Sequence, residues 1–443
     1  MSDSIIQANE FAKRRQDLAE MVGPNGVAII PGASLQTRNS DVHFPFRQDS
    51  DFWYLTGFDE PDALLVLAPG REQGEAVLFC RDRDPERERW DGPRAGLEGA
   101  ISRYGFDDAF PFSDADEVVP GLMEGREKVY CNLGKQLAFD QRVITWMNRL
   151  HQGHRKVAHP PEQLAALGHT LHEQRLIKSC AEIKAMRQSA QLAASAHRRL
   201  MNVCRPGMSE AQLSAELMHE FHSQGSEVSY LPIVGGGNNA CILHYIDNNQ
   251  VLRDGDLVLV DAGCEVEKYA SDITRTFPVN GRFSSPQQAL YEVVLAAQIA
   301  AIEKAQAGQA WLAGHDAAVN VIAQGLLDLG LLQGSLSECV ESGSYRQFFM
   351  HKTGHWLGLD VHDVGDYTVD GASRELEPGM VLTIEPGIYV PADCTDVEER
   401  WRGIGIRIED DVAVTRAQPD VLSADVPKTI HEIEALMNPS KAA

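Results

Sequence analysis

The feature of this sequence that most constrains its fold is an internal repeat. Residues 252–263 (LRDGDLVLVDAG) align without gaps on residues 376–387 (LEPGMVLTIEPG). Each copy is a turn, an apolar strand, a carboxylate and a glycine, so Asp261 corresponds to Glu385. A chance similarity between two buried strands is the alternative, but a buried carboxylate is costly unless it has a partner. The repeat therefore predicts two related halves that face each other and bring two carboxylates together.

A second carboxylate follows each repeated one on a strand-like segment. Asp272 lies in residues 269–277 and Glu409 in residues 403–410. Four acidic side chains that converge in an apolar setting cannot all stay ionised unless cations neutralise them. A divalent metal site is the simplest solution, and carboxylates suit hard or borderline ions such as Mn²⁺. Arg407 precedes Glu409 by two residues, so on a strand both would share a face. A salt bridge without catalytic effect is the alternative for this arginine.

Histidines supply further candidate ligands. His351, His355 and His362 lie close together in the sequence, and His244 stands alone in an earlier segment. A lone buried histidine is usually structural, but three of them beside the carboxylate repeat favour a site. The first two resemble the H-E-x-x-H pair of zinc peptidases, yet position 352 is lysine and position 354 is glycine. These residues remove the general base and weaken the helix, which excludes a mononuclear zinc site of that type.

The hydrophobic pattern predicts two α/β (α+β) domains. In the first 170 residues, strand-like runs alternate with helical stretches; the strands are expected at 27–30, 64–68, 76–80 and 128–132, and the helices at 11–22 and 136–150. A long helical pattern then covers residues 171–203, with a capping box at Ser179 and Glu182. Further helices are expected to begin at Ser209 and at Ser285. We place the domain boundary between residues 175 and 176.

Composition limits the possible partners and compartments. The 443-residue chain has 40 Lys and Arg against 64 Asp and Glu, a net charge of −24, which repels nucleic acid and anionic lipid. It contains no apolar run long enough for a membrane span and no secretory signal. Its eight cysteines form no C-x-x-C pair, as expected of buried thiols in a reducing compartment. We therefore expect a soluble cytoplasmic protein with no nucleic-acid or membrane partner.

The order and context of the candidate ligands resemble a known family. Asp261, Asp272, His355, Glu385 and Glu409 resemble the five-ligand dinuclear site of the methionine aminopeptidase, aminopeptidase P and prolidase superfamily. Residues 38–58 are similar to the N-terminal domain of bacterial aminopeptidase P, and residues 355–365 to its catalytic segment. The resemblance covers essentially the whole chain. It implies a creatinase-type α/β domain in residues 1–175 and a pseudo-symmetric pita-bread catalytic domain in residues 176–443.

The resemblance also implies an activity and roles for the site residues. It indicates a metal-dependent aminopeptidase that hydrolyses the bond between an N-terminal residue and a following proline, using a hydroxide shared by two divalent ions, expected to be Mn²⁺. By analogy, Asp272 and Glu409 bridge the ions, Asp261 holds one, and His355 with Glu385 holds the other. His362 and His244 are assigned as hydrogen-bond donors to the transition state. His351 would position the proline side of the substrate, and Arg407 would support a ligand carboxylate.

Several alternatives share parts of this pattern. A prolidase-type Xaa-Pro dipeptidase has the same ligands but needs a basic clamp for the dipeptide carboxylate, which the sequence does not locate. A methionine aminopeptidase would have no use for the large N-terminal domain. A non-enzymatic binding module and a metal-free creatinase-like hydrolase should both have lost ligands, and none is lost here. The resemblance further suggests a homo-oligomer, plausibly a tetramer. The charged segment 81–90 is then either a solvated loop or a loop that presents Trp90 to a substrate.

Overall fold

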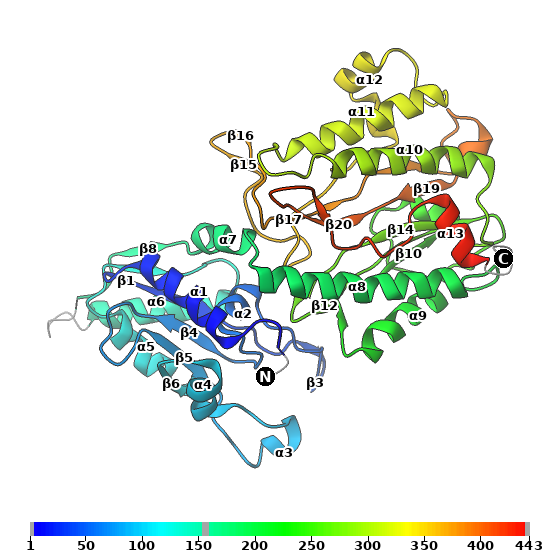
Figure 1. Cartoon of the computed structure of the whole chain (residues 1–443). Coiled ribbons are helices and arrows are strands. Elements are labelled where there is room, and N and C mark those ends of the chain that lie inside the picture. The colour runs from blue at the N-terminus through cyan, green and yellow to red at the C-terminus, as the bar shows by residue number, and fades with distance from the viewer. Residues whose placement is uncertain (1–3, 153–158, 439–443) are drawn as a thin grey trace. The chain divides into compact units, whose positions relative to one another are not determined.

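The computed structural model describes residues 4–152 and 159–438 (Figure 1). The chain divides into two compact units, Met1–Gln174 and Arg175–Ala443. This division lies one residue before the domain boundary predicted from the sequence. Within the described residues, no helix has both the length and the apolar character needed to cross a membrane. The two units are described in turn.

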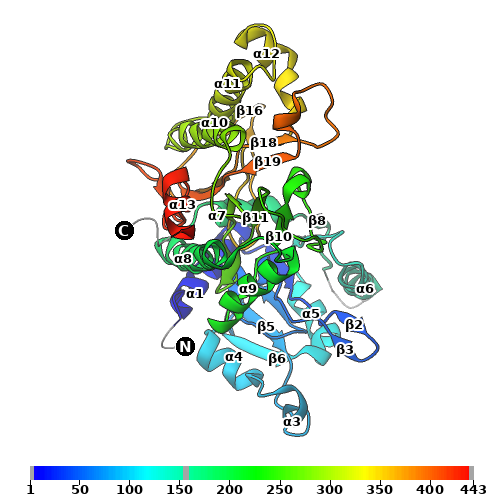
Figure 2. The ribbon, with the colours of Figure 1, turned by 90° about the vertical axis from the view of Figure 1, so that its right-hand side faces the viewer.

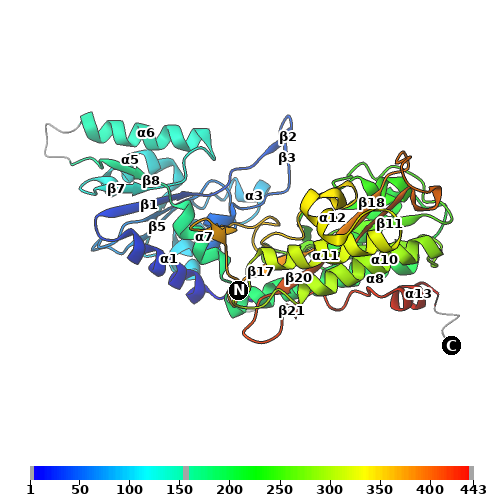
Figure 3. The same cartoon turned by 90° about the horizontal axis from the view of Figure 1, so that it is seen from above.

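The N-terminal unit is built on a six-stranded mixed sheet. Its strand order is β6 (Asp108–Pro111), β5 (Ala76–Cys80), β4 (Leu64–Leu67), β1 (Gly26–Pro31), β7 (Lys128–Tyr130) and β8 (Gln163–Ala165). Figure 3 shows helices on both faces, with α1 (Ala8–Val22) opposite α5 (Ala115–Met123) and α6 (Leu137–Gln152). The β1 and β4 strands are buried throughout except for the last residue of β1, because both faces of the sheet are covered. The predicted α/β character is confirmed.

Smaller elements complete this unit. They are β2 (Thr37–Asn39), β3 (Val42–His43), α2 (Ser50–Thr56), α3 (Glu88–Asp91) and α4 (Gly96–Tyr104). Asp49 caps α2 by accepting hydrogen bonds from two backbone N–H groups. The charged segment 81–90 is a surface loop that ends in the single-turn α3, and Trp90 is 86% exposed.

The long helical pattern predicted for residues 171–203 is two helices, which corrects that expectation. The first is α7 (Gly168–Leu176) and the second is α8 (Cys180–Val203). The chain breaks between them because the Ser179 side chain and Glu182 form a capping box, which satisfies the free N–H groups of a new helix. The predicted start of α9 (Glu210–Ser223) at Ser209 is confirmed. The next helix, α10 (Ser285–Ile302), is capped one residue earlier than predicted, by Ser284 with Gln287.

The C-terminal unit, Arg175–Ala443, contains the duplication that the repeat predicted; because the sequence predicts catalysis there, we call it the catalytic unit. In the first copy, β11 (Leu257–Asp261) pairs with β14 (Thr274–Pro278), and the intervening hairpin is β12 (Cys264–Val266) with β13 (Tyr269–Ala270). In the second copy, β17 (Val381–Ile384) pairs with β20 (Asp410–Ala413), and the hairpin is β18 (Gly387–Val390) with β19 (Ile404–Arg407). Each copy is therefore a strand, a carboxylate, a hairpin, a second carboxylate and a returning strand.

A helix pair accompanies each copy. Figure 2 shows α8 and α9 near β10 (Ile233–Gly236) and β11, and α10 and α11 (Leu312–Asp328) near β18 and β19. Residues from both halves form one continuous buried apolar cluster, which includes Val258, Ile388 and Ile406. The remaining elements are β9 (Glu227–Val228), β15 (Thr368–Val369), β16 (Ala372–Ser373), β21 (Asp420–Val421), α12 (Leu336–Ser342) and α13 (Ile430–Met437). This shared core fixes the two carboxylate-bearing copies against each other.

The glycine that ends each repeat has a steric reason. A Cβ on Gly263 would lie 1.7 Å from the backbone oxygen of Ser271, and a Cβ on Gly387 would lie 2.8 Å from that of Ile406. Only glycine permits such a close approach of two backbones. The approach lets each hairpin fold back on the glycine that begins it, close to the repeated carboxylate.

Candidate active site and metal centre

All nine residues proposed from the sequence line one cavity in the catalytic unit. The cavity has a volume of about 240 Å³. The site residues predicted from the sequence that line it are His244, Asp261, Asp272, His351, His355, His362, Glu385, Arg407 and Glu409. They come from segments separated by up to 165 positions in the chain, from 244 to 409. The fold therefore gathers into one place the side chains that the repeat and the histidine segment suggested.

The five candidate ligands lie where the two copies of the repeat meet. Asp261 ends β11 and Asp272 precedes β14, whereas Glu385 follows β17 and Glu409 precedes β20. Donor atoms of Asp272, His355 and Glu409 all lie within 4.8 Å of one another. His355 Nε2 is 3.3 Å from Asp272 Oδ2 and 3.7 Å from Glu385 Oε1. Such a set of oxygen and imidazole donors around one point suits divalent cations.

The orientation of His355 also fits a metal ligand. Its Nδ1 lies 2.9 Å from the backbone oxygen of Trp356, which can only accept a hydrogen bond. Nδ1 must therefore carry the proton, and Nε2 is directed toward the carboxylates. A backbone carbonyl that fixes the tautomer of a ligating histidine in this way is a common feature of metal sites. Residues 351–355 are not helical, in agreement with the rejection of a zinc-peptidase helix.

The electrostatics of the ligand cluster indicate a shortage of positive charge. Burial raises the pKa of Glu385 to about 7, although His355 and Arg407 oppose the shift. Burial, and then the charges of Asp272 and Glu385, raise the pKa of Glu409 well above its usual value. Burial lowers the pKa of His355, but the hydrogen bond and charge of Asp272 more than reverse this and raise it to about 9. The residues present therefore fit bound cations, which would neutralise these carboxylates.

A chain of hydrogen bonds joins Arg407 to His351. Arg407 Nη2 lies 2.5 Å from Asp261 Oδ2, and its Nη1 donates to the Tyr389 hydroxyl over 3.1 Å. The Tyr389 hydroxyl is 2.9 Å from His351 Nε2, and His351 Nδ1 is 2.6 Å from the backbone oxygen of Lys352. That oxygen only accepts, so Nδ1 carries the proton and Tyr389 donates to Nε2. Burial and the charge of Arg407 lower the pKa of His351 to about 4, which keeps the ring neutral.

The other two histidines lie on the wall of the same cavity. The His362 ring stands edge-on to the His355 ring, with centroids 4.3 Å apart. Burial and the positive charge of His355 lower the pKa of His362. His244 follows the short 3₁₀ helix Gly237–Cys241 and lines the cavity together with Leu243. Both rings are therefore able to reach a molecule bound in the cavity.

The sequence did not reveal three side chains that support the site, two by contacting ligands and one by contacting Arg407 and His351. The Tyr230 hydroxyl hydrogen-bonds to Asp261 and lies 2.5 Å from Asp272 Oδ1. Thr274 Oγ1 donates to Glu409 Oε2 over 2.6 Å, and Tyr389 holds Arg407 and His351 as described above. Thr274 lies two residues after Asp272 and Tyr389 two after the repeat glycine, so a period-of-two pattern was an available signal. Tyr230 had no such signal, because only the tertiary fold brings it to the carboxylates.

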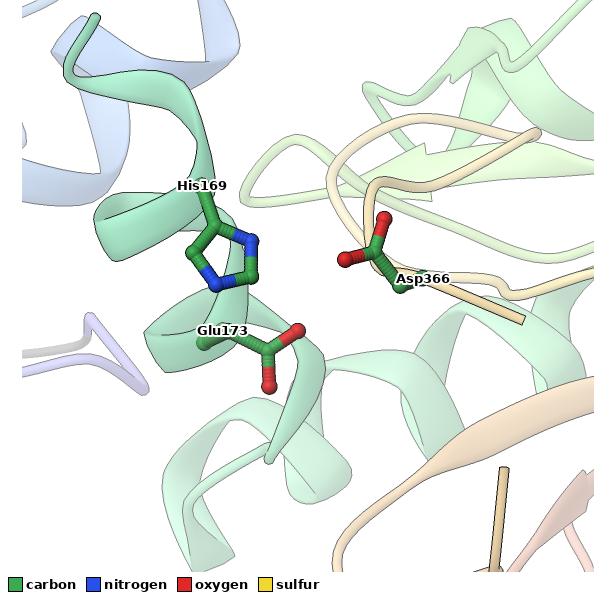
Figure 4. A group of neighbouring side chains, drawn as sticks. All are labelled: His169, Glu173 and Asp366. Atoms are coloured by element: carbon green, nitrogen blue, oxygen red, sulfur yellow. The ribbon is translucent and has the colours of Figure 1, made fainter. Parts of the chain in front are cut away.

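Two further candidate ligands lie outside this cavity. His169 and Glu173 lie one turn apart on α7 and are drawn in Figure 4. The third side chain in that figure, Asp366, belongs to the other unit, so we assign no site to the three. Exposed histidines and acidic residues of this kind are common without a metal.

Comparison with known proteins places the chain in a family. The model of metallopeptidase family M24 matches residues 184–416, and that of the aminopeptidase P N-terminal domain matches residues 11–130. An Xaa-Pro aminopeptidase of Escherichia coli is 45% identical over 436 residues, which cover 98% of both chains. Human Xaa-Pro aminopeptidase 3 is 37% identical, over 96% of this chain and 85% of its own length.

Solved structures give the same result. An aminopeptidase of Pseudomonas aeruginosa is 54% identical, covers 99% of both chains and superposes with a TM-score of 0.98. Zinc-substituted aminopeptidase P of Escherichia coli in complex with product is 44% identical, covers 98% of this chain and 99% of its own, and has a TM-score of 0.95.

The chain belongs to metallopeptidase family M24. Its full-length relatives are aminopeptidases P, so the resemblance stated from the sequence is confirmed. The predicted fold, with an aminopeptidase P-type N-terminal domain followed by a pita-bread catalytic domain, is confirmed by the same matches.

Proposed function

We propose that this chain removes the N-terminal residue from peptides with proline in second position, and that the cavity described above performs the reaction. The activity is that of a metal-dependent Xaa-Pro aminopeptidase, as in its full-length relatives, and the dipeptidase alternative is not favoured. The observation that carries the proposal is the convergence of four carboxylates and His355 in one cavity.

Divalent metal ions fit this donor set. We propose two ions per chain, with Mn²⁺ as the metal in the cell, held by Asp261, Asp272, His355, Glu385 and Glu409. Asp272 and Glu409, one from each copy of the repeat, would hold the ions together with the other three side chains. When bound, such ions lower the pKa of a coordinated water and polarise the scissile carbonyl.

The chain's own residues orient the peptide and stabilise developing charge. His362 and His244, which both line the cavity, would donate hydrogen bonds to the carbonyl oxygen as it becomes negative. His351, held in one tautomer by Tyr389 and the backbone of Lys352, would position the proline side of the substrate. Arg407 restrains Asp261 by a charge-assisted hydrogen bond. The acidic cluster also favours a cationic peptide N-terminus nearby.

The preference for proline follows from its chemistry. The Xaa-Pro bond is a tertiary amide without an N–H group, and the ring fixes φ. A peptidase that needs a hydrogen bond from that N–H cannot use the bond, whereas a cavity shaped for the ring can select it.

The activity is tested with two matched substrates, an Xaa-Pro dipeptide and an Xaa-Pro-Yaa tripeptide, offered to Mn²⁺-loaded protein with a chelator control. Faster release of the first residue from the tripeptide is expected. A preference for the dipeptide would support a prolidase-type enzyme instead. His362→Ala should lower kcat on the tripeptide, and His219→Ala, an exposed histidine on α9, is its matched control.

We also propose that the protein is cytoplasmic and forms a homo-oligomer, with a tetramer as the proposed state. The eight cysteines, none of which forms a disulfide, support a reducing compartment. In an oligomer, the exposed Trp90 could approach the active site of a neighbouring subunit. Light scattering tests this: a monomer with full activity at the same dilution would exclude the oligomer as a requirement for function.

A further inference from the structure

A second cavity of the catalytic unit adjoins the active-site cavity. It has a volume of about 280 Å³, and His351 and Lys352 line both cavities. The 3₁₀ helix Ser344–Gln347 and the residues that follow it form the rest of its wall, together with His315 of α11. The two cavities therefore share the wall formed by His351 and Lys352, so the second cavity lies within reach of a peptide that passes this wall.

The second cavity is basic, in contrast to the acidic chain around it. Arg346 and Lys352 line it, are both exposed, and form no ion pair with a carboxylate in the described part of the chain. The third basic residue, His315, is half-buried and has its Nδ1 2.8 Å from Thr353 Oγ1. Burial and the charge of Lys352 lower its pKa, although Asp316 opposes the shift. Two basic side chains, Arg346 and Lys352, thus line a cavity whose remaining walls, besides His315, are Tyr345, Phe349, Met350 and His351.

The sign of this charge indicates which part of a peptide the cavity receives. The inference rests on the proposed aminopeptidase activity, in which only one residue precedes the cleaved bond. That residue carries the cationic N-terminus, which Arg346 and Lys352 repel. The part of the peptide after proline carries no such charge and, in a tripeptide, ends in a carboxylate. The second cavity therefore matches the leaving side of the substrate.

We propose that this cavity is a subsite for the residue after proline, in which Arg346 and Lys352 bind a carboxylate. The carboxylate is either the C-terminus of a tripeptide or the acidic side chain of a longer peptide. Arginine can bind a carboxylate through two parallel hydrogen bonds, and lysine adds a point charge. Tyr345 and Phe349, both buried, support the wall behind the two cations. The subsite makes the enzyme selective for short or acidic Xaa-Pro peptides.

The test uses the metal-loaded full chain and ratios of kcat/KM, which cancel general effects on catalysis. One pair of substrates is Xaa-Pro-Leu with a free carboxylate and with a C-terminal amide. The other is Xaa-Pro-Glu-amide and Xaa-Pro-Gln-amide. We expect the carboxylate member of at least one pair to be favoured about tenfold at low salt. The first pair reports the C-terminus and the second the side chain.

Variants then assign the preference to the two cations. Arg346→Gln and Lys352→Gln should each reduce the ratio toward one, mainly through KM. Arg346→Lys should retain part of it and tests the proposal even if the glutamine variant does not fold. Arg416→Gln, an exposed arginine outside the cavity, is the matched control and should leave the ratio unchanged.

A wild-type ratio near one for both pairs would overturn the subsite while leaving the aminopeptidase activity intact. The same conclusion would follow if both glutamine variants kept the wild-type ratio. If the wild-type enzyme cleaved none of the four peptides, the proposed function itself would be refuted, and the subsite with it.

Discussion

At the scale of single residues, the site is defined by carboxylates that lack enough cations. Arg407 is the only arginine or lysine among the described residues whose side chain forms an ion pair with one of the four candidate carboxylate ligands, through Asp261. Burial lowers the pKa of His355, but the hydrogen bond and charge of Asp272, followed by the charge of Glu385, raise it above its usual value. A cluster with this balance gains stability from divalent ions, because each ion replaces protons that the carboxylates would otherwise bind.

The first prediction concerns Asp272. Its carboxylate oxygen lies within 4.8 Å of the candidate ligand atoms of His355 and Glu409. Asp272→Ala should abolish turnover and metal binding while leaving the N-terminal unit folded. Metal content per chain and the rate of tripeptide cleavage measure this. A variant with near-normal activity and two metals per chain would contradict the ligand assignment.

A second prediction concerns Tyr230, which contacts both Asp261 and Asp272. Tyr230→Phe removes this hydroxyl and leaves every candidate ligand in place. Loss of such a supporting hydrogen bond typically costs about 10–100-fold in metal affinity or activity. Metal titration of the variant tests this directly, and Tyr130→Phe in the N-terminal unit serves as the control. Unchanged affinity and rate would show that the tyrosine has only a packing role.

At the scale of elements, the two hairpins decide where the carboxylates lie. Each hairpin leaves one carboxylate at the end of a strand and returns the chain with the second carboxylate beside it. The pairing register sets this proximity, because Asp261 lies opposite Thr274 and Ile384 opposite Asp410. A shift of one residue would turn every side chain to the other face. The helix pairs behind the strands hold the register by sharing one core.

Gly263 provides a test of this close backbone approach. Gly263→Ala places a methyl group against the Ser271 oxygen, so the first hairpin must move. We expect a loss of about 1–3 kcal/mol in the free energy of unfolding and weaker metal binding. Gly121→Ala is the control, because a Cβ there meets nothing within 4 Å. Urea unfolding and metal titration of both variants would decide; wild-type values for Gly263→Ala would rule out the steric argument.

A buried ion cluster connects the start of the catalytic unit to the histidine segment. Asp363, next to His362, lies 2.9 Å from Lys178 Nζ and 2.6 Å from Arg175 Nη2. Burial raises the pKa of Asp363, but the charges of Lys178 and Arg175 outweigh it, and the pKa falls below its usual value of 3.8. The stabilisation from this carboxylate is therefore complete above the unfolded value and is lost as pH falls through the lower folded value.

Asp363→Asn should accordingly destabilise the protein by about 3–5 kcal/mol at neutral pH, because the buried Lys178 and Arg175 both lose this carboxylate, although Arg175 keeps its ion pair with Asp360. The difference from wild type should shrink only below about pH 4. Urea unfolding as a function of pH measures both effects. If the difference in unfolding free energy between wild type and variant changed near neutral pH instead, this origin of the stabilisation would be contradicted.

At the scale of the whole molecule, the candidate metal site lies within one unit. Every residue that lines its cavity belongs to Arg175–Ala443. The six-stranded sheet belongs to the other unit and contributes no residue to that cavity. Metal binding should therefore stabilise the two units unequally.

Removal of metal tests this division. Chelation should lower the stability of the catalytic unit, by about 2.7 kcal/mol per site if metal was present at one hundred times its Kd. Hydrogen exchange should show lost protection in β11, β14, β17 and β20, and little change in β1 and β4. Equal loss of protection in both units would mean that the site stabilises the chain as a whole.

The sequence by itself determined the duplicated strands, the identity of the candidate ligands and the family, because these depend on local patterns. An acidic residue that ends an apolar strand is visible twice in the same context, and three histidines lie in one short segment. Helix starts at Ser179 and Ser209 were also local, since a capping box needs only four consecutive residues.

Only the tertiary structure decided which side chains support those ligands. Tyr230 reaches Asp261 and Asp272 across separations that no local pattern encodes. Arg346 and Lys352 are six positions apart in the sequence, and only the fold makes them neighbours of one cavity. The break between α7 and α8 was missed because a helical pattern continues through a cap. Periodicity and spacing report on single elements, whereas register and packing between distant elements place the catalytic groups.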